Sequence, residues 1–346
     1  MGQARWTIYP AQDFDKHATA WDRCNSVSGD IPFMRAAFIR HALGVFGRGD
    51  EILAIRGTSA CESALLILKK SRFGTYNVFQ PSQLPLGAVV RDPTLPLQDL
   101  ARELFSVLPG TPIMIGFTQQ DPAHTHRPDG SETMETLDYV ETGWVDVQGS
   151  FADYWESRGK NLRQNVRKQR AKLESDRTYP TLDVITHVDG VNEAIEHYGA
   201  LESSGWKGAA ATAVSAGNDQ GRFYRAMLEE FCSVGAGRIY QYRFGRDIVA
   251  MDLCVESGNT QVILKTTYDQ SYKSISPSTL MRQESFREVF DRGNIRRIEF
   301  YGKLMEWHTR WTDNHRMLYH ANVFRWGSAR RVRKWLRRGE NLLRNH

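Results

Sequence analysis

The 346-residue sequence is poor in the features that mark several protein classes. Its four cysteines lie far apart and form no CxxC pair, which argues against a disulfide scaffold and a thiolate metal site. No apolar run approaches the roughly 20 residues of a membrane helix. The opening MGQARWTIYP has no hydrophobic signal region. The sequence therefore predicts a protein of a reducing, cytoplasmic compartment that holds no metal.

Excess positive charge is confined to the C-terminus. The net charge is +5, and the segment from Arg325 onward holds eight Lys and Arg residues against Glu340, so the remainder carries 5 − 7 = −2. We expect residues 326–346 to form a basic amphipathic tail, which is either a solvated terminus or a contact to an anionic membrane surface. No RNA-recognition, zinc-finger or helix-turn-helix signature makes nucleic acid the leading partner.

The length suits two medium domains, which we place at residues 1–150 and 151–325, ahead of the tail. The first mixes helical stretches with the short apolar runs EILAIRG, SALLILKK and TPIMIGF, an α/β pattern without a chemical motif. Residues 120–133 are rich in Pro, Gly, Asp and Thr, so His124 and His126 are expected in a loop rather than at a metal.

The second domain has a clearer order of elements. A long helix is expected from Phe151 to about Asp176, because apolar residues recur along one stripe of it. Further helices are expected over 192–203 and 221–234. Three strands then follow over 238–244, 248–256 and 260–268, and after them a loop, a helix to about Arg292 and a strand over 296–302. The order is β-β-β-α-β.

The alternation of apolar residues predicts the register of the second hairpin, if Gly258 and Asn259 form its turn. The expected pairs are Val255 with Val262, Leu253 with Leu264, and Met251 with Thr266. The same register sets Asp252 against Lys265 on the opposite face. This pair is either an ion pair on a half-covered sheet or a polar floor beneath a substrate cleft.

Four phrases in this half resemble a known family: SRGKNLRQNVRKQRAKLE, LESSGWKG, YDQSYKSISPSTLM and IEFYGKLMEWHTRW. From about Tyr154 to Arg325 the chain is similar to the CelD/BcsL-like acetyltransferases, relatives of the FemAB aminoacyl transferases. The resemblance implies an α/β (α+β) fold, with a GNAT-like mixed sheet flanked by helices. It also implies two GNAT-like domains in tandem, residues 1–150 being a degenerate copy. The chain departs from the family at His308, where a lysine is expected.

The loop before the last long helix is the expected donor site. A helix that begins near Ser278 presents unpaired N–H groups and a positive dipole end, which suit a pyrophosphate. The resemblance implies acetyl-CoA or another acyl-CoA as co-substrate, with its pantetheine along the edge of the third strand. The candidate donor-binding residues are Tyr268, Ser276, Pro277, Ser278 and Thr279. The alternative is a Ser-Pro helix cap that binds no ligand.

Acyl transfer from a thioester to an amine requires the neutral amine, so a positioned base helps, although proximity alone contributes strongly. The candidates for proton transfer or acceptor positioning are Glu202, Glu299, Tyr301 and His308. Glu299 and Tyr301 would share a face if the last strand continues that far. A histidine with a pKa of about 6.5 accepts a proton where a lysine cannot. The candidate substrate-binding residues are Trp206, Lys207, Asp252, Lys265 and Trp307.

Together these features predict an acyl-CoA-dependent acyltransferase that acts on an amine or hydroxyl of a cell-envelope, polysaccharide or related small-molecule precursor. One alternative is a FemAB-type transferase, whose basic helix and tail would contact aminoacyl-tRNA. Another is a non-catalytic adaptor that binds an anionic surface through the tail. The expected location is the cytoplasm, with peripheral contact to a membrane through residues 326–346.

Overall fold

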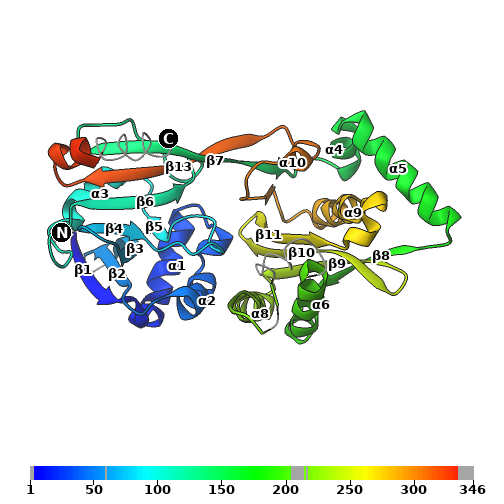
Figure 1. The fold of residues 1–346 in the computed structure, drawn as a ribbon, viewed down its shortest axis with the longest axis horizontal. Helices are drawn as coiled ribbons and strands as arrows, with labels where there is room; N and C mark the ends of the chain where they lie inside the picture. Colours follow the sequence, from blue (N-terminus) through cyan, green and yellow to red (C-terminus); the bar gives the residue numbers. More distant parts are fainter. Residues whose placement is uncertain (1–3, 59–60, 204–213, 216, 334–346) are drawn as a thin grey trace, which may run out of the picture. The chain divides into compact units, whose positions relative to one another are not determined.

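The computed structural model describes residues 4–58, 61–203, 214–215 and 217–333. The chain divides into two compact units (Figure 1). The first comprises Met1–Glu141 and Arg316–His346, and the second comprises Thr142–His315. The second unit is thus one continuous segment, whereas the first is assembled from both ends of the chain.

The first unit is a mixed sheet with helices packed on it. Its strands lie in the order β1, β2, β3, β4, β6, β13, with β5 beside β3, and only β4 and β6 pair in parallel. Their bounds are β1 Arg5–Pro10, β2 Ile52–Gly57, β3 Glu62–Lys70, β4 Thr75–Val78, β5 Val89–Arg91, β6 Met114–Gln120 and β13 His315–Phe324. The helices are η1 Ala11–His17, α1 Ala18–Val27, η2 Pro32–Met34, α2 Ala36–Phe46 and α3 Leu97–Leu104.

The apolar runs expected in this part of the sequence form β2, β3 and β6. Apolar residues of α3, among them Leu100 and Leu104, share a buried cluster with Leu66 of β3 and Phe117 of β6. The Pro- and Gly-rich segment after β6 is a loop as predicted, and it carries His124 and His126.

The second unit contains the expected β-β-β-α-β order. Its strands lie in the order β7, β12, β11, β10, β9, β8, with β11 and β12 parallel and the other neighbours antiparallel. The strands are β7 Met134–Asp146, whose residues up to Glu141 belong to the first unit, β8 Pro180–Ile185, β9 Gly237–Phe244, β10 Asp247–Ser257, β11 Thr260–Tyr268 and β12 Arg297–Glu299. The helices are α4 Phe151–Ser157, α5 Lys160–Ser175, η3 Val188–Gly190, α6 Val191–Ser203, α8 Asp219–Ser233, η4 Gln270–Ile275, α9 Pro277–Arg292 and α10 Glu306–Thr309.

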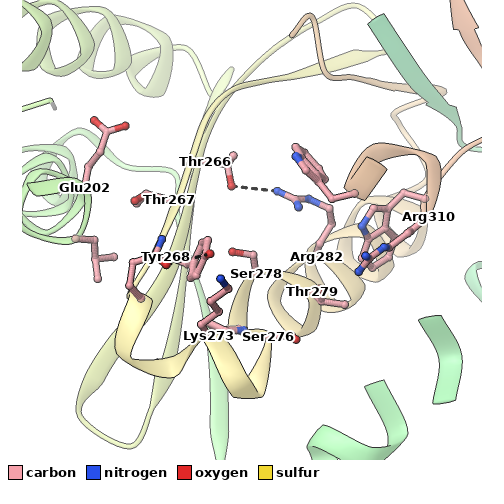
Figure 2. A pocket seen from close by; sticks show the side chains of 15 residues that line it. Glu202, Thr266, Thr267, Tyr268, Lys273, Ser276, Ser278, Thr279, Arg282 and Arg310 are labelled. Carbon is pink, nitrogen blue, oxygen red and sulfur yellow. Dashed lines mark hydrogen bonds between the residues drawn. The ribbon is translucent and has the colours of Figure 1, made fainter. Parts of the chain in front are cut away.

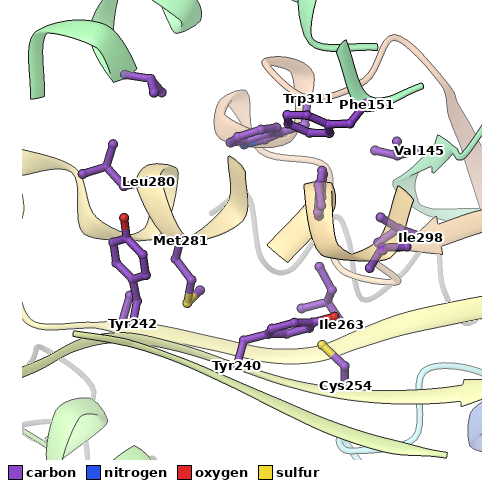
Figure 3. Packing of buried hydrophobic residues seen from close by; sticks show 14 of the residues in the cluster. Val145, Phe151, Tyr240, Tyr242, Cys254, Ile263, Leu280, Met281, Ile298 and Trp311 are labelled. Atoms are coloured by element: carbon purple, nitrogen blue, oxygen red, sulfur yellow. The ribbon is translucent and has the colours of Figure 1, made fainter. Parts of the chain in front are cut away.

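Helices cover both faces of the β9–β11 sheet. On one face Tyr240, Tyr242, Cys254 and Ile263 pack against residues of α9 such as Met281 (Figure 3). On the other face lie the fully buried Met251, Leu253 and Val255, and α6 and α8 cover it (Figure 1). Alternate side chains of β10 therefore pack into two hydrophobic cores, one on each side of the sheet.

The single long helix expected from Phe151 is wrong, because the chain breaks at Arg158 into α4 and α5. Arg158 is extended, with φ −74° and ψ 155°, and its guanidinium Nη1 donates to the carbonyl of Trp311 at 2.9 Å. Gly159 then caps the start of α5. The apolar stripe continues across the break, so periodicity alone did not reveal it.

The predicted hairpin register holds only near the turn. Val255 does pair with Val262, but a bulge at Leu264 shifts the rest, so that Leu253 faces Lys265 and Asp252 faces Thr266. The predicted pairing of Asp252 with Lys265 is therefore wrong. The extra residue changes which face each later side chain of β11 occupies. Asp252 contacts Arg282 of α9, whereas Lys265 contacts Glu202 of α6 on the opposite face.

Candidate functional site

A cavity of about 450 Å³ opens in the second unit where β11 ends and α9 begins (Figure 2). This volume falls within the range of small-molecule sites, roughly 300–1,000 Å³. The lining comes from the ends of β11 and α6, from η4, from the first turns of α9 and from the α10 segment. Its residues are Leu201, Glu202, Thr266, Thr267, Tyr268, Gln270, Lys273, Ser276, Pro277, Ser278, Thr279, Arg282, Trp307, Arg310 and Trp311.

The start of α9 is one wall of this cavity. Ser276 adopts a left-handed conformation, with φ 56° and ψ 54°, and turns the chain sharply from η4 into the helix. Pro277 follows at the first helical position, where a missing N–H costs nothing. The Ser278 Oγ is buried and has no hydrogen-bond partner among the described residues. A buried hydroxyl at a helix N-terminus, with Lys273 also lining the cavity, suits an anionic ligand group.

The strand β11 reaches the cavity beyond its pairing with β12. The parallel ladder joins Thr260, Gln261 and Val262 to residues 297–299 of β12, while β11 itself continues to Tyr268. The last residues of β11, Thr266 to Tyr268, line the cavity. An extended ligand can therefore lie beside this part of the strand and meet the start of α9 at its end.

A buried ion pair lies beside the cavity. The Arg282 guanidinium Nη2 is 3.0 Å from the nearer carboxylate oxygen of Asp252, and it also donates to the Thr266 hydroxyl at 3.2 Å (Figure 2). Both charged side chains are almost wholly buried, with 3% and 1% exposure. The guanidinium carbon of Arg282 lies 4.5 Å from the centre of the Trp307 ring. The Arg282–Asp252 pair holds this wall of the cavity in position, because separating the two buried charges would cost free energy.

His308 is buried behind the Trp307 wall and is not among the residues that line the cavity. Its Nδ1 accepts the Met305 N–H at 2.8 Å, which leaves the Nε2 to carry the proton of the neutral ring. Burial, and then the positive charge of Arg282, lower the pKa of His308 to about 4. The imidazole is therefore neutral at pH 7, and its unprotonated Nδ1 already accepts the backbone N–H of Met305.

Glu202 lines the cavity from the end of α6. Its Oε2 accepts the Val214 N–H at 2.6 Å, and its Oε1 lies 3.7 Å from the Nζ of Lys265. The Lys265 ammonium also lies 5.7 Å from the centre of the Tyr224 ring. A carboxylate with 3% exposure is thus held at the edge of the cavity by a backbone amide and a cation.

The structure separates the other candidates from the cavity. Glu299 is buried on β12, with its Oε1 3.7 Å from Nη1 of Arg297. The expected strand over 296–302 is wrong in length, because β12 ends at Glu299 and Tyr301 has a φ of 45°. Glu299 and Tyr301 therefore do not lie on one continuous strand, so the alternation of a strand does not place them on the same face. Trp206 and Lys207 lie outside the described residues.

The comparison with protein families bears directly on this unit. Residues 160–309 match the family described as acetyltransferase (GNAT) domain. The second unit carries a GNAT acetyltransferase domain. The protein is therefore a transferase, and the cavity described above lies within the matched region apart from the end of the α10 segment.

Three solved structures are similar in fold to this chain over both of its units. The chain is similar to the C-terminal domain described as that of a lysylphosphatidylglycerol synthetase from Agrobacterium fabrum, with 14% identity over 90% of this chain and 92% of that one, at a TM-score of 0.55. A conserved protein of unknown function from Bacteroides thetaiotaomicron gives 11% identity, coverages of 93% and 100%, and a TM-score of 0.54. FemX gives 8% identity, coverages of 93% and 98%, and a TM-score of 0.51.

No curated protein matches the chain. None of the helices within the described ranges combines the length and apolar character that crossing a bilayer demands. Over the same ranges, His, Cys, Asp and Glu side chains form no cluster of three or more suited to a metal ion.

Sequence reasoning missed several residues of the GNAT domain that line the cavity. Lys273, Arg282 and Arg310 were not among the candidates, although all three line it, whereas the sequence had suggested Trp311 as a possible wall for an apolar acceptor. One signal was present for Arg282, because it follows Ser278 by four residues and so lies on the same face of the helix. Arg310 follows α10, and the sequence offered no sign that this short helix returns to the cavity.

Proposed function

We propose that this protein is an acyl-CoA-dependent acyltransferase, with acetyl-CoA the first donor to test. The observation that carries the proposal is the start of α9, where the buried Ser278 hydroxyl has no partner among the described residues and faces a cavity suited to an anion. The GNAT domain supports a thioester of coenzyme A as donor in general. In this proposal the pyrophosphate lies at Ser276, Ser278 and Thr279.

Affinity requires more than the helix end. A charge at a helix N-terminus contributes only about 0.3–1 kcal/mol. The proposal therefore includes backbone pairing of the pantetheine arm with Thr266 to Tyr268, beyond the segment of β11 that β12 covers. Pro277 orders the first helical turn, and the Tyr268 ring lines the cavity beside this part of the strand.

The acceptor in this proposal is an amine or hydroxyl of a cell-envelope, polysaccharide or related small-molecule precursor. Glu202 is the candidate to position it, because this carboxylate is held at the cavity edge. Trp307 is the candidate to pack against its apolar face, because its ring lines the cavity over Arg282. In the transfer, the acceptor forms its bond to the acyl carbon, the carbon–sulfur bond breaks, and the acceptor's proton leaves for the solvent or the thiolate.

The test is calorimetric titration of the native protein and two variants with CoA and acetyl-CoA. Ser278→Glu places a carboxylate where we expect a phosphate, and a carboxylate at a helix N-terminus does not destabilise the helix. Binding should weaken by at least about tenfold, which corresponds to about 1.4 kcal/mol. Ser274→Glu is the matched control, because Ser274 is exposed on η4 and does not line the cavity.

Two results would contradict the proposal in different ways. A native protein that binds neither CoA nor acetyl-CoA rules out the acyl-CoA donor. Saturable binding that Ser278→Glu leaves unchanged keeps the donor but removes it from the start of α9. If Ser274→Glu and Ser278→Glu weaken binding equally, the effect is one of overall charge and not of the site.

A second candidate is aminoacyl transfer from a charged tRNA, and one observation favours it. Arg163, Arg167 and Arg170 of α5 line a shallow groove of about 370 Å³ together with Trp155. Phosphate contacts from arginine and stacking on an aromatic ring suit RNA. However, Arg163 and Arg170 already pair with Glu156 and Glu284. Saturable transfer from aminoacyl-tRNA, with none from acyl-CoA, would favour this candidate.

The proposal includes a cytoplasmic location, where acyl-CoA and precursors meet, and contact of residues 326–346 with an anionic membrane surface. Most of this tail lies outside the described residues. The GNAT domain favours an enzyme over the adaptor that we considered from the sequence. Vesicle binding without any CoA binding or transfer would favour the adaptor instead.

A further inference from the structure

An exposed phenylalanine at the tip of the β3–β4 hairpin has a backbone conformation that phenylalanine disfavours. Phe73 is 88% exposed and has a φ of 57°, and Gly74 follows with a φ of 68°. The Thr75 N–H donates to the Arg72 carbonyl at 3.3 Å, so Phe73 and Gly74 are the central residues of a tight turn. With both φ values positive, such a turn prefers Asn or Asp before Gly. Phe73 weakens its own turn while its ring remains in solvent.

A second exposed aromatic lies at the same end of this sheet. The Ile113 N–H donates to the Gly74 carbonyl at 2.7 Å, and the Arg325 N–H donates to the Ile113 carbonyl at 2.9 Å. These bonds place the hairpin tip, the start of β6 and the end of β13 side by side. Trp326, next to Arg325, is 47% exposed. The two aromatic side chains therefore belong to one surface of the first unit.

Basic side chains surround these aromatics. Lys70, Arg72 and Arg325 are exposed, and the Arg325 guanidinium carbon lies 5.1 Å from the centre of the Trp326 ring. An exposed carboxylate, Glu132, lies beside Gly327. We name the set Lys70, Arg72, Phe73, Arg325 and Trp326 the basic-aromatic end. It combines exposed rings with an excess of positive charge at one end of the strands β3, β4, β6 and β13.

We infer that the basic-aromatic end docks onto the surface of an anionic lipid bilayer. Phenylalanine and tryptophan are favoured at the boundary between headgroups and acyl chains. Lysine and arginine beside them are attracted by the negative surface potential of anionic lipids. This combination explains why an aromatic ring occupies a turn position that favours asparagine. The docking surface lies wholly in the first unit. It shares Trp326 with residues 326–346, for which a membrane contact is proposed above, and it extends that contact to the β3–β4 hairpin. It does not depend on the acyl transfer proposed for the GNAT domain.

The test is flotation of the full chain with vesicles of phosphatidylcholine, with and without about 30% phosphatidylglycerol as the anionic lipid. The native protein should float only with the anionic vesicles. Phe73→Asn should weaken this binding by about tenfold, because the variant loses the burial of one aromatic side chain. The variant should unfold at the same or a higher temperature, because asparagine suits the turn. Lost binding then cannot be ascribed to lost structure.

Two further variants separate the contribution of the Phe73 ring from that of other exposed rings and from that of the basic side chains. Tyr179→Asn removes another aromatic, 71% exposed and located in the second unit, and should bind the vesicles as the native protein does. Lys70→Gln together with Arg72→Gln should weaken binding by roughly fivefold for each charge removed and should reduce its dependence on salt.

Several results would overturn the inference. They are no flotation with anionic vesicles, equal flotation with neutral ones, or an unchanged affinity in Phe73→Asn. An unchanged affinity in Phe73→Asn, with binding abolished by removal of residues 334–346, would assign the contact to residues 334–346 alone. Binding to heparin or DNA in preference to vesicles would identify a polyanion partner. Self-association that Phe73→Asn abolishes would identify a second copy of the chain.

Discussion

At the residue scale, three titratable side chains around the cavity are held by protein partners. Asp252 pairs with Arg282, Glu202 accepts a backbone N–H and lies near Lys265, and His308 accepts the N–H of Met305. Partners of this kind fix the position of each group. They also make single substitutions costly, because each one leaves a partner buried without its hydrogen bond.

The stability of the protein should depend on His308 between pH 4 and 6.5. The folded protein binds the proton at a pKa of about 4, whereas the unfolded chain binds it near 6.5. Acidification through this range therefore favours the unfolded state, and the contribution of His308 is complete above pH 6.5 and lost as the pH falls to about 4. Its size should be about 3 kcal/mol.

The measurement compares the native protein with His308→Asn by urea unfolding at several pH values. Asparagine can still accept the Met305 N–H, but it does not titrate. The difference in unfolding free energy between the two proteins should change over pH 4–6.5 and stay constant above it. A difference that is the same at every pH would contradict the lowered pKa of the buried imidazole.

At the element scale, α9 is attached to the sheet by polar contacts as well as apolar ones. Tyr242 donates to Glu284 at 2.6 Å and Tyr240 to Glu288 at 2.8 Å, while Arg292 lies 2.6 Å from Glu256. Residues 284, 288 and 292 recur every four positions and so form one row on the helix. The helix that carries the donor site at its N-terminus is thus fixed along its length.

The Arg282–Asp252 pair is the more deeply buried of the two ion pairs that join α9 to β10, and the effects of removing its two charges should be strongly coupled. Asp252→Ala leaves a buried guanidinium without its carboxylate and should lower the unfolding free energy by about 3–5 kcal/mol. Arg282→Met leaves a buried carboxylate and should cost a similar amount. The double variant Asp252→Leu with Arg282→Met should lose much less than the sum. Additive losses, measured by chemical unfolding, would show that the two charges do not stabilise each other.

The sequence predicted the elements whose signals are local. The bounds of β9, β10, β11 and α9 follow from alternation between two tight turns and from Ser-Pro at a helix start. The bulge at Leu264 was not predictable in this way, because an extra residue leaves the alternation on each side intact. The break at Arg158 was hidden too, since its bond to the carbonyl of Trp311 joins residues 153 positions apart.

For the site, the sequence indicated the start of α9, and Ser276, Pro277, Ser278 and Thr279 do line the cavity. It did not indicate that Arg282 and Arg310 line the cavity beside Trp311, because that wall depends on how α10 packs. Nor did it indicate that β12 ends at Glu299, since the apolar pattern continues into Phe300 while the backbone turns at Tyr301.

At the scale of the whole molecule, the two units differ in how the chain builds them. The GNAT domain lies in one continuous segment, whereas β13 of the first unit comes from the C-terminal end. There β13 pairs with β6 and buries Leu318, Tyr319 and Val323, and Arg316 forms a bidentate bond to the buried Asp121. The first unit therefore lacks part of its core until β13 is in place.

Removal of residues 316–346 should unfold the first unit and leave the second folded. The cut deletes β13, a strand whose buried side chains would each cost about 1.5–3 kcal/mol to lose. We expect hydrogen exchange to become fast throughout β2, β3 and β6, while β9, β10 and β11 stay protected. A chain ending at Arg333 is the control, because it keeps β13 and should retain protection in both units. Retained protection of β6 in the shorter chain would contradict this expectation.

The discontinuous first unit has a consequence for synthesis on the ribosome. Domains generally fold as units from the N-terminus while the chain is being made. Here the segment Thr142–His315 is translated in full before β13 is. The second unit is thus the first to be completed, and the N-terminal strands emerge early but must wait with one side of β6 uncovered. In a nascent chain, the strands of the first unit therefore need protection until β13 has been made.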